Sequence, residues 1–153
     1  MTYREKIDGF LSQKIIAVAG VSRNPQGHIG NFIYRKFKTS GYKVYQLNPA
    51  ASEIEGEKCY PTIMSIPEKV DAVFVATNAK DSADVVRQCS EAGVKKIWFH
   101  KAFGPGNYTE EAVRLCKDYN IEAILSGCPA MFLNADFGHK CFKFFLKVSG
   151  KLR

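Results

Sequence analysis

A glycine-rich loop is the part of this chain whose residue types best suit the binding of a ligand. The loop follows an apolar run at residues 15–19 and precedes residues 29–37, where apolar side chains recur at helical spacing. A strand, a glycine loop and a helix in this order present backbone N–H groups and a helix N-terminus to a phosphate group. The candidate binding residues of the loop are Gly20, Val21, Ser22, Arg23, Gly27 and Gly30.

The spacing of these glycines matches neither of the two common phosphate-binding patterns. The loop is longer than the G-x-G-x-x-G pattern of dinucleotide-binding proteins, and no Gly-Lys-Ser/Thr follows as in a Walker loop. An ordinary connection between a strand and a helix, without a ligand, is therefore an alternative at this point.

The charged residues near the loop favour some nucleotides over others. An NAD-binding protein usually closes its second strand with a carboxylate that binds the ribose hydroxyls, whereas here the run at residues 43–47 is followed by Asn48 and Pro49. Coenzyme A needs a glycine loop and nearby cations, which Arg23, Lys80 and Lys101 supply. The guanidinium group of Arg23 suits phosphate geometry, and NADP is disfavoured less than NAD because basic residues are plentiful.

The histidines and cysteines do not form a recognisable metal site. His28, His100 and His139 lack the spacing of metal ligands, and no zinc pattern includes Cys128 and Cys141. A catalytic pair of Cys128 with a histidine is possible, but a cysteine packed in a turn is the better interpretation. No pair of carboxylates indicates acid–base catalysis.

Strands and helices alternate along the chain with short connections, which predicts an α/β fold. We expect a doubly wound, mostly parallel, five-stranded Rossmann-like sheet with helices on both faces. The expected strands are residues 15–19, 43–47, 71–76, 96–100 and 122–125, and the expected helices are residues 2–12, 28–40, 82–92 and 109–119. Residues 53–64 are predicted to be a loop, with a short extended piece around Cys59 and Tyr60.

Right-handed crossovers place the loops that follow parallel strands at one edge of the sheet. The sequence therefore predicts the site in the loops at residues 20–30, 48–49, 76–80, 100–106 and 126–131. Outside the glycine loop, the candidate cofactor-binding residues are Asn48, Pro49, Ala76, Thr77, Asn78, Lys80, His100, Lys101, Cys128 and Pro129.

Composition limits the class of protein. The 153 residues suit one domain, and no apolar run approaches the roughly 20 residues of a membrane span. No signal peptide is evident, and five scattered cysteines favour reduced thiols, so we expect a cytoplasmic protein. The net charge of +7 favours anionic partners, but the basic residues are dispersed, which disfavours nucleic acid.

The order of several short motifs resembles small single-domain CoA-binding proteins, which are relatives of the N-terminal domain of the succinyl-CoA synthetase α subunit. The motifs are Gly20–Pro25, Gly41–Pro49, Gly56–Pro61, Ile66-Pro67, Lys96-Ile97-Trp98 and Gly127-Cys128-Pro129. The resemblance covers about residues 10–132 and implies a Rossmann-like fold that binds coenzyme A.

The resemblance also implies roles for individual residues. Gly20, Ser22 and Arg23 would contact the phosphates of the ligand. The residues Asn48, Pro49, Ala76, Thr77 and Asn78 would line the nucleotide pocket, and the turn at Cys128 and Pro129 would close one side.

The chain departs from the family pattern, and two of the departures bear on function. Many members carry a lysine directly after the Asn-Pro pair, where this chain has Ala50 and Ala51, which weakens the case for tight binding. The phosphohistidine domain of the ligase has no counterpart in this sequence, so the resemblance does not imply synthetase chemistry.

The end of the chain carries an apolar stripe on a basic background. Phe137, Cys141, Phe144, Phe145 and Val148 share one helical face, which predicts an amphipathic helix at residues 136–149. The stripe is expected to cover its own domain, with a homodimer interface or a membrane surface as the alternatives.

These observations together predict a non-catalytic protein that binds coenzyme A or an acyl-CoA, acting as a sensor or as the partner of an enzyme. The alternatives are an NAD(P)-binding redox sensor and a nucleotide-binding interaction module. No membrane span is expected.

Overall fold

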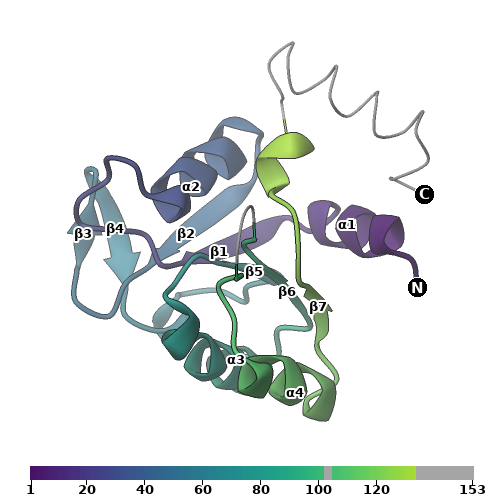
Figure 1. Cartoon of the computed structure of the whole chain (residues 1–153). Helices are drawn as coiled ribbons and strands as arrows, with labels where there is room; N and C mark the ends of the chain where they lie inside the picture. Colours follow the sequence, from purple (N-terminus) through teal and green to yellow (C-terminus); the bar gives the residue numbers. More distant parts are fainter. Residues whose placement is uncertain (102–104, 134–153) are drawn as a thin grey trace.

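The computed structural model describes residues 1–101 and 105–133, so the predicted helix at residues 136–149 lies outside the described residues. The strands of the described part are Ile15–Ala19 (β1), Lys43–Leu47 (β2), Glu53–Ile54 (β3), Glu57–Tyr60 (β4), Ala72–Val75 (β5), Lys96–Phe99 (β6) and Glu122–Ile124 (β7). They form one sheet in the order β3-β4-β2-β1-β5-β6-β7 (Figure 1). All neighbouring strands of that sheet pair in parallel except β3 and β4.

The two central strands, β1 and β5, explain why the sequence shows apolar runs rather than alternation. Both faces of the sheet are covered here, so four of the five residues of β1 and all four residues of β5 are buried. The pairing register places Ala17 opposite Val73 and Ala19 opposite Val75. The strands therefore end together at the same edge of the sheet.

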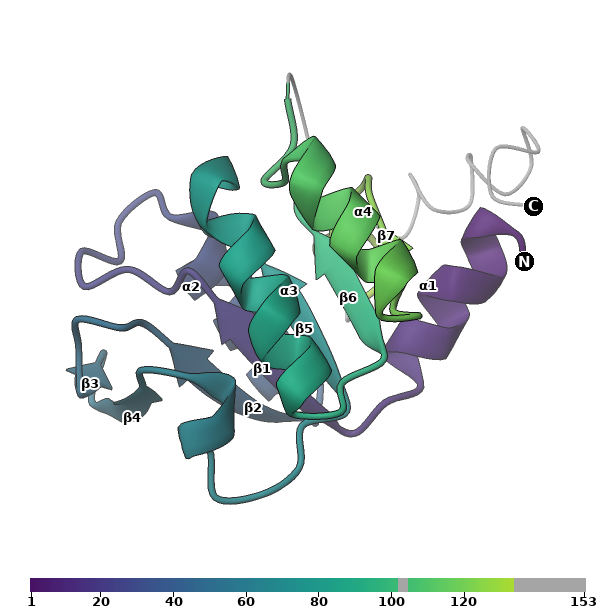
Figure 2. The ribbon, with the colours of Figure 1, turned by 90° about the horizontal axis from the view of Figure 1, so that it is seen from below.

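Helices cover both faces, which confirms the expected doubly wound arrangement. One face carries Tyr3–Leu11 (α1), Ile29–Thr39 (α2) and the short 3₁₀ helix Pro129–Met131 (η3), and the other carries Ser82–Glu91 (α3) and Glu110–Asp118 (α4). Figure 2 shows α3 and α4 side by side over their face. The two short helices that remain are Ile63–Ser65 (η1) and Ala79–Asp81 (η2).

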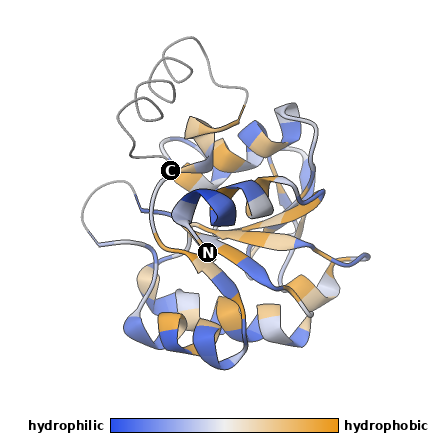
Figure 3. Ribbon diagram, turned by 90° about the vertical axis from the view of Figure 1, so that its right-hand side faces the viewer, coloured by the Kyte–Doolittle hydropathy of each residue, from blue (hydrophilic) through white to orange (hydrophobic). Residues whose placement is uncertain are grey.

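Two hydrophobic cores lie on the two faces of the sheet. In Figure 3 orange, hydrophobic stretches run through the sheet, and the helices carry both blue and orange stretches. On the side of α1 and α2, the rings of Phe10 and Trp98 meet edge to face with centroids 5.4 Å apart. On the side of α3 and α4, Val86 and Cys89 of α3 are completely buried. No helix in the described part is long and apolar enough to cross a membrane.

The structure corrects the expected number of strands from five to seven. Each of the five expected strands is present, with bounds that differ by no more than one residue, and the extended piece at Cys59 and Tyr60 is the end of β4. β4 joins the sheet beside β2, and β3 pairs only with β4. The sequence predicted a loop here because β3 contains two residues, too few to show an alternating pattern.

The hairpin of β3 and β4 has two stabilising features that the sequence pattern did not reveal. Glu55 and Gly56 connect the strands with φ angles of 53° and 76°, as a two-residue hairpin turn requires. The Nε2 atom of Gln46, a completely buried residue of β2, donates to the carbonyl oxygens of Ile54 at 3.0 Å and Glu57 at 3.1 Å. The buried amide therefore attaches the hairpin to the sheet.

The contact between α2 and the loop before it predicts the effect of adding one methyl group at Gly30. A Cβ atom there would overlap the carbonyl oxygen of Gly20 and lie 2.9 Å from its carbonyl carbon. Since backbone must then move, we expect Gly30→Ala to lower the free energy of unfolding by about 1–3 kcal/mol in urea denaturation.

The matched control is Gly9→Ala in α1, where the nearest atom is the flexible end of Lys96. Alanine favours a helix over glycine by about 0.5–1 kcal/mol, so this variant is expected to keep or gain stability. Equal effects of the two substitutions would contradict the close approach at Gly30.

Candidate functional site

The candidate site lies at the edge of the sheet where the parallel strands end. The residues that sequence analysis selected follow five strands: Gly20 follows β1, Asn48 follows β2, Ala76 follows β5, His100 follows β6 and Cys128 lies beyond β7. The strand order reverses between β1 and β5, because β1 leads to β2 on one side while β5 leads to β6 on the other. Open α/β sheets bind ligands at such a switch point.

The glycine loop begins in direct contact with the end of β5. Gly20 has a φ of +93°, and a Cβ atom there would lie 2.5 Å from the backbone of Ala76 and Thr77. The N–H of Gly20 donates to the carbonyl of Leu47 at 3.3 Å, and the N–H of Ala76 donates to the carbonyl of Ala19 at 2.8 Å. The loop therefore starts at a fixed position between the ends of β2 and β5.

Asn31, which sequence analysis did not select, holds the next part of the loop. Its Oδ1 accepts from the N–H of Ser22 at 2.7 Å, and its Nδ2 donates to the carbonyl of Ser22 at 2.9 Å. Asn31 is completely buried, and its Nδ2 also lies 3.5 Å from a carboxylate oxygen of Glu55, which pairs with Arg35. The polar side chain within an otherwise apolar helix face was the available sequence signal.

Asn48 joins the loops that follow β1 and β2. Its Nδ2 donates to the carbonyl of Val21 at 2.9 Å, and its Oδ1 accepts from the N–H of Ala50 at 2.8 Å. Both ends of the amide are thus engaged by backbone, and Val21 is buried beneath them. Asn48 shapes the site rather than offering a free polar group to a ligand.

A cleft of about 250 Å³ opens beside these loops, on the face of the sheet that carries α3. Pro49 and Thr77, both selected from sequence, line it. Its other lining residues are Ala19, Leu47, Pro61, Asp81, Asp84, Val85 and Gln88. Sequence analysis selected neither Asp81 nor Asp84, because the cleft forms only where α3 and the ends of β1 and β2 come together in the fold.

Thr77 has hydrogen-bonding capacity that the described residues do not use. Its Oγ1 is buried and has no partner within the described residues, and its carbonyl accepts from the side chain of Asn107. A buried hydroxyl without a partner is energetically unfavourable, so a bound polar group would satisfy it.

The three selected cations keep their charges available. Arg23 and Lys80 are exposed and Lys101 is half-buried. In the part of the chain that the structure describes, neither an ion pair nor a side-chain hydrogen bond engages any of the three. Asn78 and Gly27 are also exposed at this edge, so the loops present positive charge to solvent.

His100 and Cys128 lie on the other side of the sheet from the cleft. The ring of His100 meets that of Phe74 with centroids 6.1 Å apart, and Cys128 packs on the same core. Burial lowers the pKa of the His100 imidazole. Burial raises the pKa of the Cys128 thiol, although the N–H of Ala130 partly opposes this. The thiol is therefore protonated at neutral pH and a poor nucleophile.

No cluster of three His, Cys, Asp or Glu side chains within residues 1–101 and 105–133 could hold a metal ion. His139 and Cys141, which the sequence analysis also considered as metal ligands, lie outside the described residues. Pro129, the last of the selected residues, is buried at the start of η3 and supports the turn at Cys128.

Comparisons with known proteins find a family of CoA-binding domains and CoA ligases that contain a similar segment. The model of a family described as a CoA binding domain matches residues 14–134. ADP-forming acetate–CoA ligase I of Archaeoglobus fulgidus is 30% identical over 135 residues, which make up 81% of this chain and 20% of the ligase. This chain thus spans about a fifth of the length of that relative.

Two solved structures share the fold. A hypothetical protein from Pyrococcus horikoshii OT3 superposes with a TM-score of 0.73 at 27% identity, over 84% of this chain and 87% of that one. A dinucleotide-forming acetyl-coenzyme A synthetase 1 of Ca. Korarchaeum cryptofilum gives a TM-score of 0.62 at 34% identity, over 72% of this chain and 25% of that one.

The contacts of Asn31 predict that its amide stabilises the loop. We expect Asn31→Ala to lower the free energy of unfolding by about 1–3 kcal/mol, because the N–H and carbonyl of Ser22 lose their partner. Asn24→Ala, which truncates an exposed amide in the same loop, is the control and should change stability little. Denaturant unfolding compares the two, and equal losses would show that the amide of Asn31 has no special role.

Proposed function

This chain belongs to the family of CoA-binding domains, and on that premise we propose that it binds coenzyme A or an acyl-CoA at the edge of the sheet where β1 and β5 end. The observation that carries the proposal is the position of the glycine loop beside the cleft. The loop offers backbone N–H groups and Arg23 to a pyrophosphate, and the cleft offers a half-enclosed space to the adenosine.

The parts of the proposed site have distinct roles. The loop from Gly20 to Gly30 receives the phosphates, and the amides of Asn31 and Asn48 hold it in place beforehand. A loop that is already ordered loses little conformational entropy when it binds, which favours affinity. Pro49 and Thr77 contact the nucleoside in the cleft.

We propose binding without catalysis, in a sensor or in the partner of an enzyme. The matched relatives include ligases of which this chain covers about a fifth, so ligase activity is not transferred to it. His100 and Cys128, the residues best suited to nucleophilic chemistry, face away from the cleft, and burial raises the pKa of the thiol.

A second candidate ligand is NAD, and one observation favours it. The sequence argument against NAD rested on the missing carboxylate after β2. The carboxylates of Asp81 and Asp84 line the cleft from α3, and carboxylates accept hydrogen bonds from ribose hydroxyls. Direct comparison of the ligands must therefore decide between coenzyme A and NAD.

Calorimetry with coenzyme A, acetyl-CoA, NAD, NADP and ATP tests the proposed function. We expect a CoA compound to bind more tightly than NAD, NADP or ATP. If NAD binds more tightly than every CoA compound, the proposal is wrong and the protein is better interpreted as an NAD-binding redox sensor. If none of the five compounds binds, the protein is better interpreted as an interaction module.

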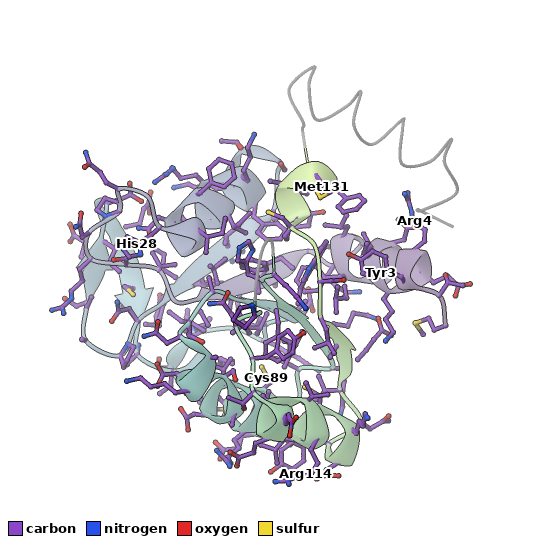
Figure 4. The ribbon with its side chains drawn as sticks, viewed as in Figure 1. Tyr3, Arg4, His28, Cys89, Arg114 and Met131 are labelled. Atoms are coloured by element: carbon purple, nitrogen blue, oxygen red, sulfur yellow. The ribbon has the colours of Figure 1, made fainter. Side chains whose placement is uncertain are left out.

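Arg23 provides a test at the level of one residue. If its guanidinium pairs with the pyrophosphate, Arg23→Ala should cost about 1.5–3 kcal/mol of binding free energy, as charge-assisted hydrogen bonds do. Arg114→Ala is the matched control, because Arg114 is an exposed arginine on α4, away from His28 and the glycine loop (Figure 4). Similar small losses in both variants, removed alike by salt, would indicate diffuse electrostatic attraction instead.

A further inference from the structure

The cleft beside the glycine loop carries negative charge, although the chain as a whole has a net charge of +7. Two of its lining residues, Asp81 and Asp84, are acidic, and no lysine, arginine or histidine is among the lining residues. The charge of the cleft is therefore opposite in sign to that of the loop, where Arg23 is exposed.

One of these carboxylates is held in position by a second side chain. The Nε2 atom of Gln88 donates to Oδ2 of Asp84 at 2.9 Å, and the Oε1 atom of Gln88 accepts from the N–H of Ile63 at 3.1 Å. Because Gln88 is anchored to backbone, Asp84 cannot turn away from the cleft without losing a hydrogen bond. The negative charge of Asp84 is therefore held at the wall of the cleft.

The polar groups of the cleft suit hydroxyl and amino groups better than phosphate. The carboxylates of Asp81 and Asp84 only accept hydrogen bonds, which ribose hydroxyls and the amino group of adenine donate. The Oγ1 of Thr77, which has no hydrogen-bond partner within the described residues, can donate or accept. A phosphate monoester carries between one and two negative charges at neutral pH and is repelled by both carboxylates.

Within residues 1–101 and 105–133, no positively charged side chain lines the cleft. The residues after Pro49 are Ala50 and Ala51, which carry no charge. Lys80 belongs to η2 together with Asp81, and it is exposed without lining the cleft.

We propose that the site selects an adenosine whose ribose carries no phosphate, so that dephospho-coenzyme A binds more tightly than coenzyme A. The inference rests on the proposed function, since it assumes that the adenosine occupies this cleft. Coenzyme A differs from dephospho-coenzyme A by a phosphate on the 3′-hydroxyl of the ribose. We expect this phosphate to weaken binding, while the loop binds the pyrophosphate that both ligands share.

Calorimetric titration of the full chain with the two ligands tests this selectivity. At low salt we expect dephospho-coenzyme A to bind about tenfold more tightly than coenzyme A, because two carboxylates act on the additional charge. The ratio should shrink as salt rises, since these side chains are exposed and their charges are screened.

A charge-neutral double variant, Asp81→Asn with Asp84→Asn, identifies the cause. It should strengthen the binding of coenzyme A about tenfold and change that of dephospho-coenzyme A much less. Asp118→Asn is the matched control, because it removes the same charge from an exposed site at the end of α4. The control variant should leave the ratio of the two affinities unchanged.

The results separate this inference from the proposed function. If coenzyme A binds as tightly as dephospho-coenzyme A or more tightly, the selectivity is wrong while the function stands. Lys80→Gln then shows whether Lys80 binds the 3′-phosphate, by weakening coenzyme A alone. If neither ligand binds, the proposed function itself is wrong, and the inference fails with it.

Discussion

Three backbone segments approach one another at the end of β1 more closely than any side chain would permit. A Cβ atom at Gly20 would lie 2.5 Å from the backbone of Ala76 and Thr77, and one at Gly30 would overlap the carbonyl oxygen of Gly20. These contacts bring the start of α2 and the end of β5 against the same turn. The position of the glycine loop, and hence of the candidate site, depends on this close approach.

The side-chain amides of Asn31, which is buried, and Asn48, which is half-buried, also fix the position of the loop. Glycine permits a close approach but leaves the backbone free to move, whereas Asn31 and Asn48 each bond to backbone atoms at two positions. The first part of the glycine loop, at Val21 and Ser22, is therefore held in place before any ligand arrives. Order of this kind reduces the entropy lost on binding, and it explains why polar side chains are found in an otherwise apolar region.

The distribution of charge around the site is more informative than the net charge. A value of +7 suggests anionic partners in general, and Arg23, Lys80 and Lys101 at the edge of the sheet agree with this. The cleft itself is acidic. A ligand with its charge at one end and a neutral nucleoside at the other fits this pattern better than a polyanion does.

The sequence by itself determined the order of the five expected strands and four α-helices, the doubly wound class and the loops that lie at the carboxyl edge of the sheet. Apolar runs such as Ile15–Ala19 suffice for this, because strands covered on both faces must be apolar throughout, and parallel strands with helical crossovers must end at one edge. Local pattern and chain connectivity carry that information.

Only the tertiary structure decided which side chains meet in the cleft and which lie on the opposite face. Asp84 and Pro49 are 35 positions apart in the chain, and they line one cleft because α3 packs beside β1 and β2. His100 and Cys128 lie on the other face, because the His100 ring packs on Phe74 and Cys128 packs on the same core at the start of η3. The hairpin of β3 and β4 depends on the buried amide of Gln46, a long-range contact that local periodicity cannot encode.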